Sequence, residues 1–409
     1  MNANAIFRPA DILLPNLARI NGTRWSTVAC DQYTSQPDYW ERVRRFVGDA
    51  PSTLRLMLPE IDLDRSDSEI PVIHRAMETA LKSWLIPCPG AMLLLERTQA
   101  DGRVRRGIIG AVDLEAYDYR AGAVSPIRAT EGTVLERIPP RVKIRRGAPI
   151  EMPHIMLLFN DPQGTVIPPL LQQRSGLPLL YDYDLMENGG HVRGYLLSQS
   201  LQDSLTAALG ALCEGQGDHP LLFAVGDGNH SLASAKAAYE EIKAAIGSEA
   251  ARSHPARYAL AEIVNLHDTA LDFEPIYRVV FGTKPERLAA DFRAFAAEQN
   301  GSAGAQDFCV VTTAGEETVT VRHPAFTLPV ATLQAFLDSR PGLTVDYIHG
   351  EDALRTLAGR PDAVGFLFRG MEKADLFPAV LADGALPRKT FSMGHAHDKR
   401  FYLECRKIQ

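Results

Sequence analysis

Short apolar runs typical of β-strands alternate with helix-like stretches along the whole chain, and this alternation constrains the fold more than any other feature. The helix-like stretch over residues 232–246 is rich in Ala, Glu and Lys, which favour helices. No internal repeat and no low-complexity segment interrupts the pattern. The alternation therefore predicts a mixed α+β fold and argues against an all-helical or all-strand protein.

Turn-forming residues between two strand-like runs predict a β-hairpin at two places in the chain. The turns are Asp101-Gly102, between 91–96 and 104–113, and Glu187–Gly190, between 179–185 and 191–197. Helices are predicted at 36–47, where Ser35 is a candidate cap, and at 200–213, 232–246, 285–299, 333–338 and 371–381. Further strands are predicted at 154–159, 221–225, 308–313, 318–322, 364–368 and 401–405.

A chain of 409 residues is long enough for two or three domains of ordinary size. Gly and Pro interrupt the pattern at Phe281–Pro285, which indicates a domain boundary there. We expect a first domain over 1–278 and a second, α+β domain over 279–409. Roughly the last 25 residues are expected to return to the first domain.

The composition excludes several classes of protein. The chain has 43 Lys and Arg against 50 Asp and Glu, and its net charge of -7 gives no overall attraction to nucleic acid or anionic lipid. No apolar run approaches the ~20 residues of a membrane-spanning helix, and the first residues lack a secretory signal. The cysteines are far apart without a CxxC pair, which predicts reduced thiols. We expect a cytoplasmic protein without membrane or nucleic-acid partners.

The most specific local signal is the strand-like run 221–225, which leads through Gly226–Ser231 into a helix. Such a strand–turn–helix unit directs backbone N–H groups and the positive end of a helix dipole at an anion. Gly226 and Gly228 lack side chains where a phosphate would approach the backbone. The turn therefore predicts a phosphate site, although it lacks the Gly-Lys-Ser/Thr ending of a Walker A loop.

Two side chains of this turn add chemistry. Asp227 offers a carboxylate for Mg²⁺ or for accepting a proton, and His230 can donate to a phosphoryl oxygen. The alternative is an ordinary βα turn in which Asn229 or Ser231 caps the helix.

A second group of charged and hydroxyl side chains lies between Ser125 and Arg137. Glu131 and Glu136 are candidate bases, and Arg128 and Arg137 are candidate phosphate ligands.

Basic and apolar residues alternate directly after this group. If the segment is a strand, Arg141, Lys143 and Arg145 share one face while Val142 and Ile144 occupy the other. The basic face is either a source of cations for a polyphosphate or a solvated charged surface.

Polar residues also gather near both ends of the chain. Residues 25–35 read as a short strand that leads to polar groups ahead of a helix, a common place for a site in α/β folds. Pro387–Ser392 contains two cations and two hydroxyls. His395, His397 and Asp398 either ligate a metal or form a polar loop, and nothing nearby completes a metal site.

Taken in order, these segments resemble the DUF1015 family, whose core is similar to the ParB/sulfiredoxin superfamily. The most specific match is Asp227–Ser231, which corresponds to the family's Asp-Gly-His-His-Arg motif. The other matching segments are Val28–Tyr33, Arg128–Arg137, Glu274–Arg278 and Pro387–Phe391. The resemblance implies a ParB/sulfiredoxin-like nucleotide-binding core with an added C-terminal α+β region.

The resemblance also implies an activity, because similar members are kinases that phosphorylate free serine with a nucleotide. It implies ATP or ADP with Mg²⁺ as the phosphoryl donor, Asp227 as the metal ligand and a small alcohol such as free serine as the acceptor. The expected catalytic residues are Asp227, Glu131 and His230, with Asp227 or Glu131 as the base. The expected nucleotide ligands are Gly226, Gly228, Asn229, Ser231, Arg141, Lys143 and Lys389.

Four positions depart from the family pattern, namely Thr130, Asn229, Ser231 and Tyr277. At position 231 an Arg is replaced by Ser, which cannot form the bidentate contact of a guanidinium with phosphate. Another cation must then take its place, or the substrate differs. These departures leave open a nucleotide-binding regulatory module without turnover. A ParB-like DNA-associated protein is a further alternative, against which the net charge and the lack of a helix-turn-helix segment argue.

Overall fold

The computed structural model describes residues 3, 6–30, 33–34, 36–120, 122–132, 136 and 138–409. The chain divides into two compact units. Unit 1 comprises Met1–Ala129, Thr133–Leu271 and His395–Gln409, and unit 2 comprises Thr130–Gly132 and Asp272–Gly394.

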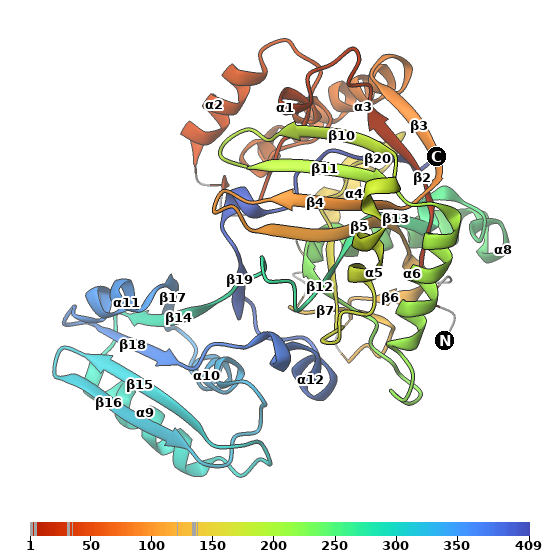
Figure 1. Ribbon diagram of the computed structural model, residues 1–409. Helices are drawn as coiled ribbons and strands as arrows, with labels where there is room; N and C mark the ends of the chain where they lie inside the picture. The colour runs from red at the N-terminus through yellow and green to blue at the C-terminus, as the bar shows by residue number, and fades with distance from the viewer. Residues whose placement is uncertain are drawn as a thin grey trace. The chain divides into compact units, whose positions relative to one another are not determined.

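A mixed sheet forms the centre of unit 1 (Figure 1). Its order is β10-β11-β4-β5-β13-β9-β12-β7-β6, and β1 pairs with β5. The hairpins β4–β5 and β10–β11 are antiparallel, whereas β12 runs parallel to β7 and antiparallel to β9. The strands are β1 (Phe7–Arg8), β4 (Leu93–Thr98), β5 (Val104–Asp113), β6 (Tyr117–Asp118), β7 (Ile127–Ala129), β9 (Met156–Phe159), β10 (Leu179–Asp184), β11 (His191–Leu196), β12 (Phe223–Asp227) and β13 (Tyr258–Asn265).

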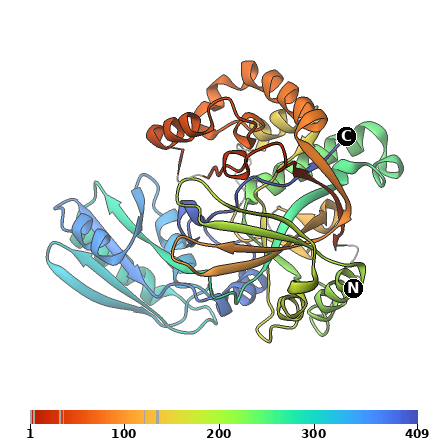
Figure 2. The same ribbon diagram turned by 45° about the horizontal axis from the view of Figure 1, so that its top comes forward.

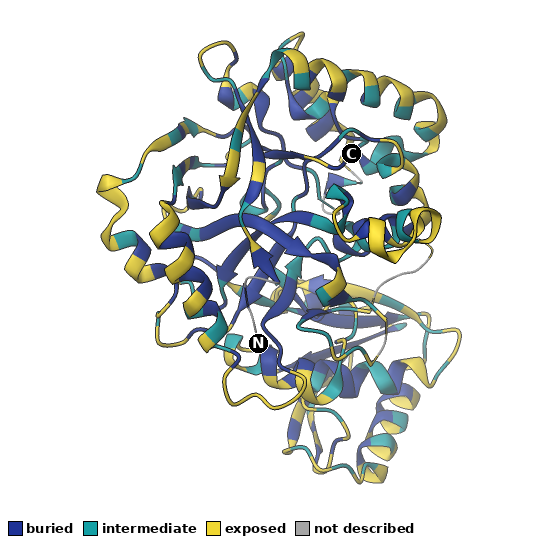
Figure 3. Ribbon diagram, turned by 90° about the vertical axis from the view of Figure 1, so that its right-hand side faces the viewer, coloured by how far each residue is buried: buried dark blue, intermediate teal, exposed yellow. Residues whose placement is uncertain are grey.

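Both faces of the central strands are buried, because successive strand residues enter two different apolar cores. On β4, Leu93 and Leu95 belong to one core and Leu94 to the other. The first core is covered by α1 (Gly22–Trp25), α2 (Pro37–Val47) and α3 (Ser66–Ser83), which are red to orange in Figure 2. The second is covered by α5 (Ile167–Gln172), α6 (Gln199–Ala211) and α7 (Asn229–Ile246). Figure 3 shows the central strands dark blue and the outer faces of helices yellow.

A smaller sheet of order β3-β2-β20-β8 completes unit 1. It joins distant segments of the chain, because the C-terminal strand β20 pairs antiparallel with β2 and with β8. Its strands are β2 (Ala10–Pro15), β3 (Leu85–Ala91), β8 (Ile150–Glu151) and β20 (Cys405–Lys407). The remaining helices of unit 1 are α4 (Ile138–Arg145) and α8 (Ser248–Ala251).

Unit 2 is a sheet of order β16-β15-β18-β14-β17, with β19 paired to β14. Phe366 packs with Phe292 of α9 and Phe336 of α10, whereas a Cβ on the adjacent Gly365 would meet Leu354 of α11. Neighbouring residues point to opposite faces, so α9 and α10 cover one face of the sheet and α11 the other. The elements are β14 (Phe273–Phe281), α9 (Pro285–Glu298), β15 (Gln306–Thr312), β16 (Gly315–Val321), α10 (Pro329–Asp338), β17 (Thr344–His349), α11 (Glu351–Ala358), β18 (Ala363–Phe368), α12 (Lys373–Asp383) and β19 (Phe391–Met393).

The mixed α+β fold is confirmed, and so are both predicted hairpins. In the second hairpin, Glu187 and Asn188 both have positive φ, as a type I′ turn requires. No helix in the described part of the chain is long and apolar enough to cross a membrane.

Three predicted strands are wrong. The segment carrying Arg141, Lys143 and Arg145 is helix α4, in which the buried Ile138 and Val142 lie four residues apart on one helical face. Residues 22–25 form helix α1, and Thr27 makes only an isolated bridge to Tyr402. The run 401–405 contributes only its last residue to a strand, since β20 begins there. Asp31, Gln32 and Ser35 lie outside the described residues.

Candidate functional site

The turn between β12 and α7 leaves the beginning of a long helix uncapped. Gly228 is the N-cap of α7 in a left-handed conformation, with φ of 83° and ψ of 27°, and it has no side chain to cap the helix. The first turn of the helix contains no acidic residue, so any carboxylate that offsets the helix dipole comes from outside the helix. Asn229 and Ser231 lie inside the helix rather than at its N-cap, so the interpretation of either residue as the cap is wrong.

Gly228 is required by the turn itself. Its positive φ is unfavourable for any other residue, and a Cβ would lie 3.1 Å from the Cα of Ile155. The glycine therefore fits close packing within the chain, and a substitution here would strain the turn instead of simply filling a ligand's place. Gly226, Asp227, His230 and Ser231 are all partly buried.

Asp227 is held from two sides. Its Oδ1 accepts a hydrogen bond of 2.9 Å from the backbone N–H of Gly228, and its Oδ2 lies 3.5 Å from Nζ of Lys399. Burial by itself raises the pKa of Asp227, but the charges of Lys399 and His154 and the Gly228 hydrogen bond outweigh burial and lower it. An ionised carboxylate with a low pKa is a weak base and a good cation ligand, so its position favours metal binding over proton transfer.

Tyr402 is the centre of a cluster of polar groups beside Asp227. Its hydroxyl is 2.7 Å from Nδ1 of His154. Burial raises the pKa of Tyr402, the charge of Asp227 adds to this, Arg141 opposes it, and Cys30 raises it further. Asp227, Arg141 and Cys30 are therefore within electrostatic range of Tyr402. Segments far apart in the sequence therefore meet at one place in unit 1.

The backbone around Lys399 is fixed by buried arginines. Arg97 donates to the carbonyls of His397, at 2.7 Å, and Lys399, at 3.3 Å, and Arg105 donates to the carbonyl of Asp398 at 2.8 Å. Both side chains are at most 3% exposed. The position of Lys399 is thus set by the core of unit 1 and not by its own flexible side chain alone.

Arg400, the residue after Lys399, also holds the backbone of this segment in place. Arg400 contacts Glu262 at 3.1 Å and Glu404 at 2.8 Å, and all three side chains are at most 3% exposed. Glu262 also pairs with Arg105 at 3.3 Å. The C-terminal segment is therefore anchored by a buried ion network on both sides of Lys399.

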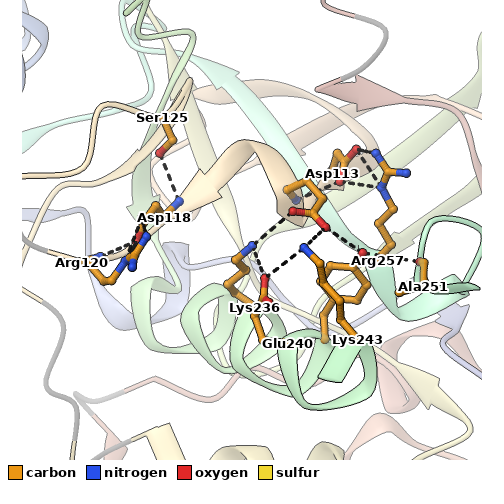
Figure 4. Close-up of polar contacts among 11 residues, drawn as sticks. Asp113, Asp118, Arg120, Ser125, Lys236, Glu240, Lys243, Ala251 and Arg257 are labelled. Carbon is orange, nitrogen blue, oxygen red and sulfur yellow. Dashed lines mark hydrogen bonds and ion pairs between the residues drawn. The ribbon is translucent and has the colours of Figure 1, made fainter. Parts of the chain in front are cut away.

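Helix α7 is anchored by a separate set of charges beyond its first turn (Figure 4). These residues link the helix to the segment that follows β5, and none of them belongs to the turn at Gly228. The contacts are Lys236–Glu240 at 2.7 Å, Lys243–Glu115 at 2.6 Å, Tyr239–Glu115 at 2.9 Å and, beside them, Arg257–Asp113 at 2.6 Å.

On helix α4 the three cations do not share one face: Arg141 and Arg145 lie four residues apart on one side, and Lys143 lies on another. Each pairs with a different carboxylate: Arg141 with Glu60, Lys143 with Asp67, and Arg145 with Glu151 at 2.5 Å. Of the three, Arg141 is the one whose charge acts on Tyr402. The common cationic strip is therefore wrong, and Arg141 is the member that the structure brings near the Asp227 cluster.

A second cluster lies in unit 2. Leu386 donates to the carbonyl of Thr130 at 2.8 Å, and Glu131 forms a parallel β-bridge with Leu386. The next turn is held by Arg278, which donates to the carbonyls of Lys389 at 3.0 Å and Arg388 at 3.1 Å.

Charge and strain mark this second cluster. Arg278 is fully buried, and burial lowers its pKa to about 10 while the charges of Tyr347 and Glu131 oppose the shift. Lys389 is exposed and has a φ of 58°, an unfavourable conformation for a lysine. Tyr277, one of the departures from the family pattern, is buried and donates to Glu351 at 3.4 Å. Three segments of the resemblance thus converge in unit 2.

Other predicted residues have different surroundings. Arg128 donates to the carbonyls of Val124, Ser125 and His219, so it braces the loop before β7. Glu136 is exposed, and Arg137 lies outside the described residues. His395 caps the short 3₁₀ turn Ala396–Asp398, which contains His397, and Asp398 accepts from the His395 backbone N–H. Across the described residues, no group of three or more His, Cys, Asp or Glu could hold a metal.

Lys399, Tyr402 and His154 join this site although the sequence did not predict them as site residues. No local pattern marks them, because Lys399 and Tyr402 come from an irregular segment and His154 precedes a buried strand. Only the anchoring of the C-terminal segment in unit 1 brings them to Asp227.

Residues 13–340 match the family described as "Protein of unknown function (DUF1015)". This chain belongs to the DUF1015 family. The match ends before Pro387–Phe391 and before Lys399, so the family comparison does not cover these residues. No curated protein matches this chain.

Several solved structures are similar to this chain at low identity. A free serine kinase in complex with AMP is 10% identical with a TM-score of 0.38, covering 73% of this chain and 91% of that chain. A mutant free serine kinase in complex with ADP is 11% identical with a TM-score of 0.37, covering 75% and 93%. SbnI with a C-terminal truncation, from Staphylococcus aureus, is 10% identical with a TM-score of 0.34, covering 73% and 81%. At these scores the likeness carries no argument about activity.

Proposed function

We propose that this protein is a nucleotide-dependent kinase that phosphorylates a small alcohol such as free serine. The observation that carries the proposal is the uncapped beginning of α7 beside the Asp227–Lys399 pair. Backbone amides at a helix start that no N-cap side chain occupies, a helix dipole and an ammonium group together suit a polyphosphate. The resemblance of Asp227–Ser231 to the Asp-Gly-His-His-Arg motif, which implies a nucleotide-binding core, points to the same ligand.

Mg²⁺ fits this site in the way it usually binds nucleotides. It commonly takes one or two carboxylates and completes its shell with water and phosphate oxygens, so Asp227 alone is a sufficient protein ligand. When bound, Mg²⁺ neutralises charge that develops on the transferred phosphoryl group. The backbone amides at the start of α7 would hold the polyphosphate, and His230 would donate to a phosphoryl oxygen.

The lowered pKa of Asp227 makes that carboxylate a poor proton acceptor, so of the two candidate bases that the family resemblance implies, Glu131 is the one we propose from the sequence motif. In the reaction, the alcohol oxygen of the acceptor forms a bond to the terminal phosphorus of ATP or ADP. The bond from this phosphorus to the bridging oxygen breaks, the alcohol proton passes to the base, and ADP or AMP leaves.

Thermal unfolding with ATP, ADP, CTP or GTP plus Mg²⁺ tests nucleotide binding. A ligand at 100 times its dissociation constant adds about 2.7 kcal/mol to the stability of the native state, which is a measurable shift. The protein is then incubated with the binding nucleotide and free serine or other small alcohols, and products are identified by mass spectrometry. A phosphorylated acceptor supports the kinase, whereas binding without any product supports the regulatory module. No shift with any nucleotide contradicts both.

A further inference from the structure

We infer that Lys399 binds the terminal phosphate of the nucleotide and supplies the charge that Ser231 lacks. This inference rests on the proposed function, because it assigns a residue to the same phosphate site. Lys399 lies beyond residue 340, where the family match ends, so the family comparison gives it no role.

The geometry around Lys399 leaves its ammonium group able to bind a second anion. Its distance of 3.5 Å to Oδ2 of Asp227 exceeds the roughly 2.7–2.9 Å of a strong charge-assisted hydrogen bond. Oδ2 is buried, and its contact with Nζ of Lys399 is too long for a strong hydrogen bond. A lysine has three N–H donors, and one loose ion pair does not use them all.

The position of Lys399 relative to the helix start follows from Asp227. The same carboxylate accepts the N–H of Gly228 at one oxygen and pairs with Lys399 at the other. The Asp227 carboxylate therefore lies between the ammonium group of Lys399 and the N-cap amide of α7. A phosphate bound by the first amides of this helix would meet Lys399 at its side.

Lys399 has one ion-pair partner among the described residues, yet its backbone is held by several buried side chains. Buried Arg97 and Arg105 hold its backbone, and buried Arg400 anchors the next residue. A surface lysine that merely balances one aspartate needs no such support, because exposed pairs contribute little to stability. Rigid placement is what a phosphate ligand needs, since it reduces the entropy lost on binding.

Other cations fit this role less well. The charge of Arg141 acts on Tyr402, but Arg141 is paired with Glu60. Lys143 is exposed and paired with Asp67. Lys389 belongs to unit 2, whereas the Gly226–Ser231 turn belongs to unit 1. Among the described residues of unit 1, Lys399 is the cation whose ion-pair partner, Asp227, belongs to the Gly226–Ser231 turn itself.

The test measures binding of inorganic pyrophosphate, ADP and adenosine by calorimetry for the wild type, Lys399→Met and Lys399→Arg. Lys399→Met should weaken pyrophosphate and ADP about 10- to 100-fold, the effect of losing a hydrogen bond to a charged group. Adenosine carries no phosphate, so its binding should not change. Lys399→Arg should retain most of the affinity, and the difference between wild type and Lys399→Met should shrink as salt rises.

Lys407→Met is the matched control, because it removes one positive charge from an exposed position of the same C-terminal segment. Its affinities should equal those of the wild type. Lys399→Met leaves the Asp227 carboxylate buried without this partner, which can prevent folding. In that case the double variant Asp227→Asn/Lys399→Met, which removes both charges, is measured in place of Lys399→Met.

The outcomes separate the two proposals. Pyrophosphate and ADP binding that is unchanged in folded Lys399→Met, or in the double variant, overturns the role of Lys399 and leaves the nucleotide site standing. If the wild type binds pyrophosphate but no nucleotide, and Lys399→Met loses pyrophosphate binding, the result supports Lys399 as an anion ligand and contradicts the kinase. A wild type that binds neither pyrophosphate nor ADP overturns both.

Discussion

The clusters in the two units hold their charged groups in different ways. In unit 1, Asp227 and Lys399 neutralise each other, and the buried Arg400 pairs with two carboxylates. In unit 2, the buried Arg278 donates mainly to backbone carbonyls, and Lys389 is exposed in a strained conformation. Side-chain ion pairs join segments that are distant in sequence, whereas backbone acceptors fix one local turn. Unit 1 therefore has the properties of a preorganised binding site, and unit 2 those of a shaped loop with a carboxylate, Glu131.

The largest expected effect tests whether these clusters differ in role. Glu131→Gln should lower turnover about 10²- to 10⁴-fold, as the loss of a general base does, while the nucleotide affinity of unit 1 stays unchanged. Steady-state kinetics and calorimetry on the same preparation measure both. Glu136→Gln, an exposed carboxyl of the same group, is the control and should have wild-type turnover. Equal losses in the two variants would contradict Glu131 as the base.

The next prediction concerns the buried ion network of unit 1. Arg400→Met leaves Glu404 and Glu262 with fewer partners in a site at most 3% exposed. Breaking such a buried pair costs about 3–5 kcal/mol, so unit 1 should unfold at much lower urea concentration. Hydrogen exchange read peptide by peptide should place the loss in unit 1.

Arg355→Met is the control for that prediction. Arg355 pairs with Glu316 and Glu351 at exposed positions of unit 2, and such pairs contribute about 1 kcal/mol or less. If the two variants lose similar stability, the contrast between a buried network and a surface network is not real.

Acid should weaken unit 1 through the same buried carboxylates. Burial raises the pKa values of Glu262, Glu151 and Asp227, but their basic partners outweigh burial and lower them. A carboxyl with a lowered folded-state pKa stabilises the protein fully above its unfolded pKa of about 4, and this contribution is lost as the pH falls through the folded value. In unit 2, Glu316 also has a lowered pKa but is exposed beside Arg355, where solvent screens the pair.

Hydrogen exchange over a series of decreasing pH values measures this difference. Amides of unit 1 should lose protection at a higher pH than amides of unit 2. The reverse order would show that the buried carboxylates do not dominate the acid response. Glu262→Gln should reduce the pH dependence of unit 1, because it removes one of the titrating groups.

Local patterns in the sequence predict much of this fold, and long-range contacts explain what they miss. The hairpin at Glu187–Gly190 and the unit from β12 to α7 follow from turn residues and periodicity within short windows. The helix over 138–145 was missed because a short alternation of basic and apolar residues fits a strand as well as a helix. Burial of Ile138 and Val142 on one face decides between them, and burial depends on the rest of the fold.

The candidate site was predicted only where its residues form a motif. Asp227 and the turn around it are recognisable, because glycine and helix-start preferences act between neighbours. Lys399 and Tyr402 reach Asp227 through the path of a chain segment more than 170 residues later, which no local preference encodes. Their positions depend on carbonyls that Arg97 and Arg105 bind, so only the folded core specifies them.

The smallest expected effect separates charge from backbone strain at Lys389. With a φ of 58°, a lysine is less favourable than glycine by about 1 kcal/mol, so Lys389→Gly should stabilise unit 2 by up to about 1 kcal/mol. Lys389→Met keeps the strain and removes the charge, so its stability should equal that of the wild type. Urea unfolding and ADP affinity are measured for both variants. If Lys389 has only a structural role in the turn held by Arg278, both variants bind ADP like the wild type. If its charge acts on the nucleotide, both variants lose ADP affinity, although Lys389→Gly gains stability. Because strained residues persist where function requires them, the second result would explain why a lysine occupies a position that suits glycine.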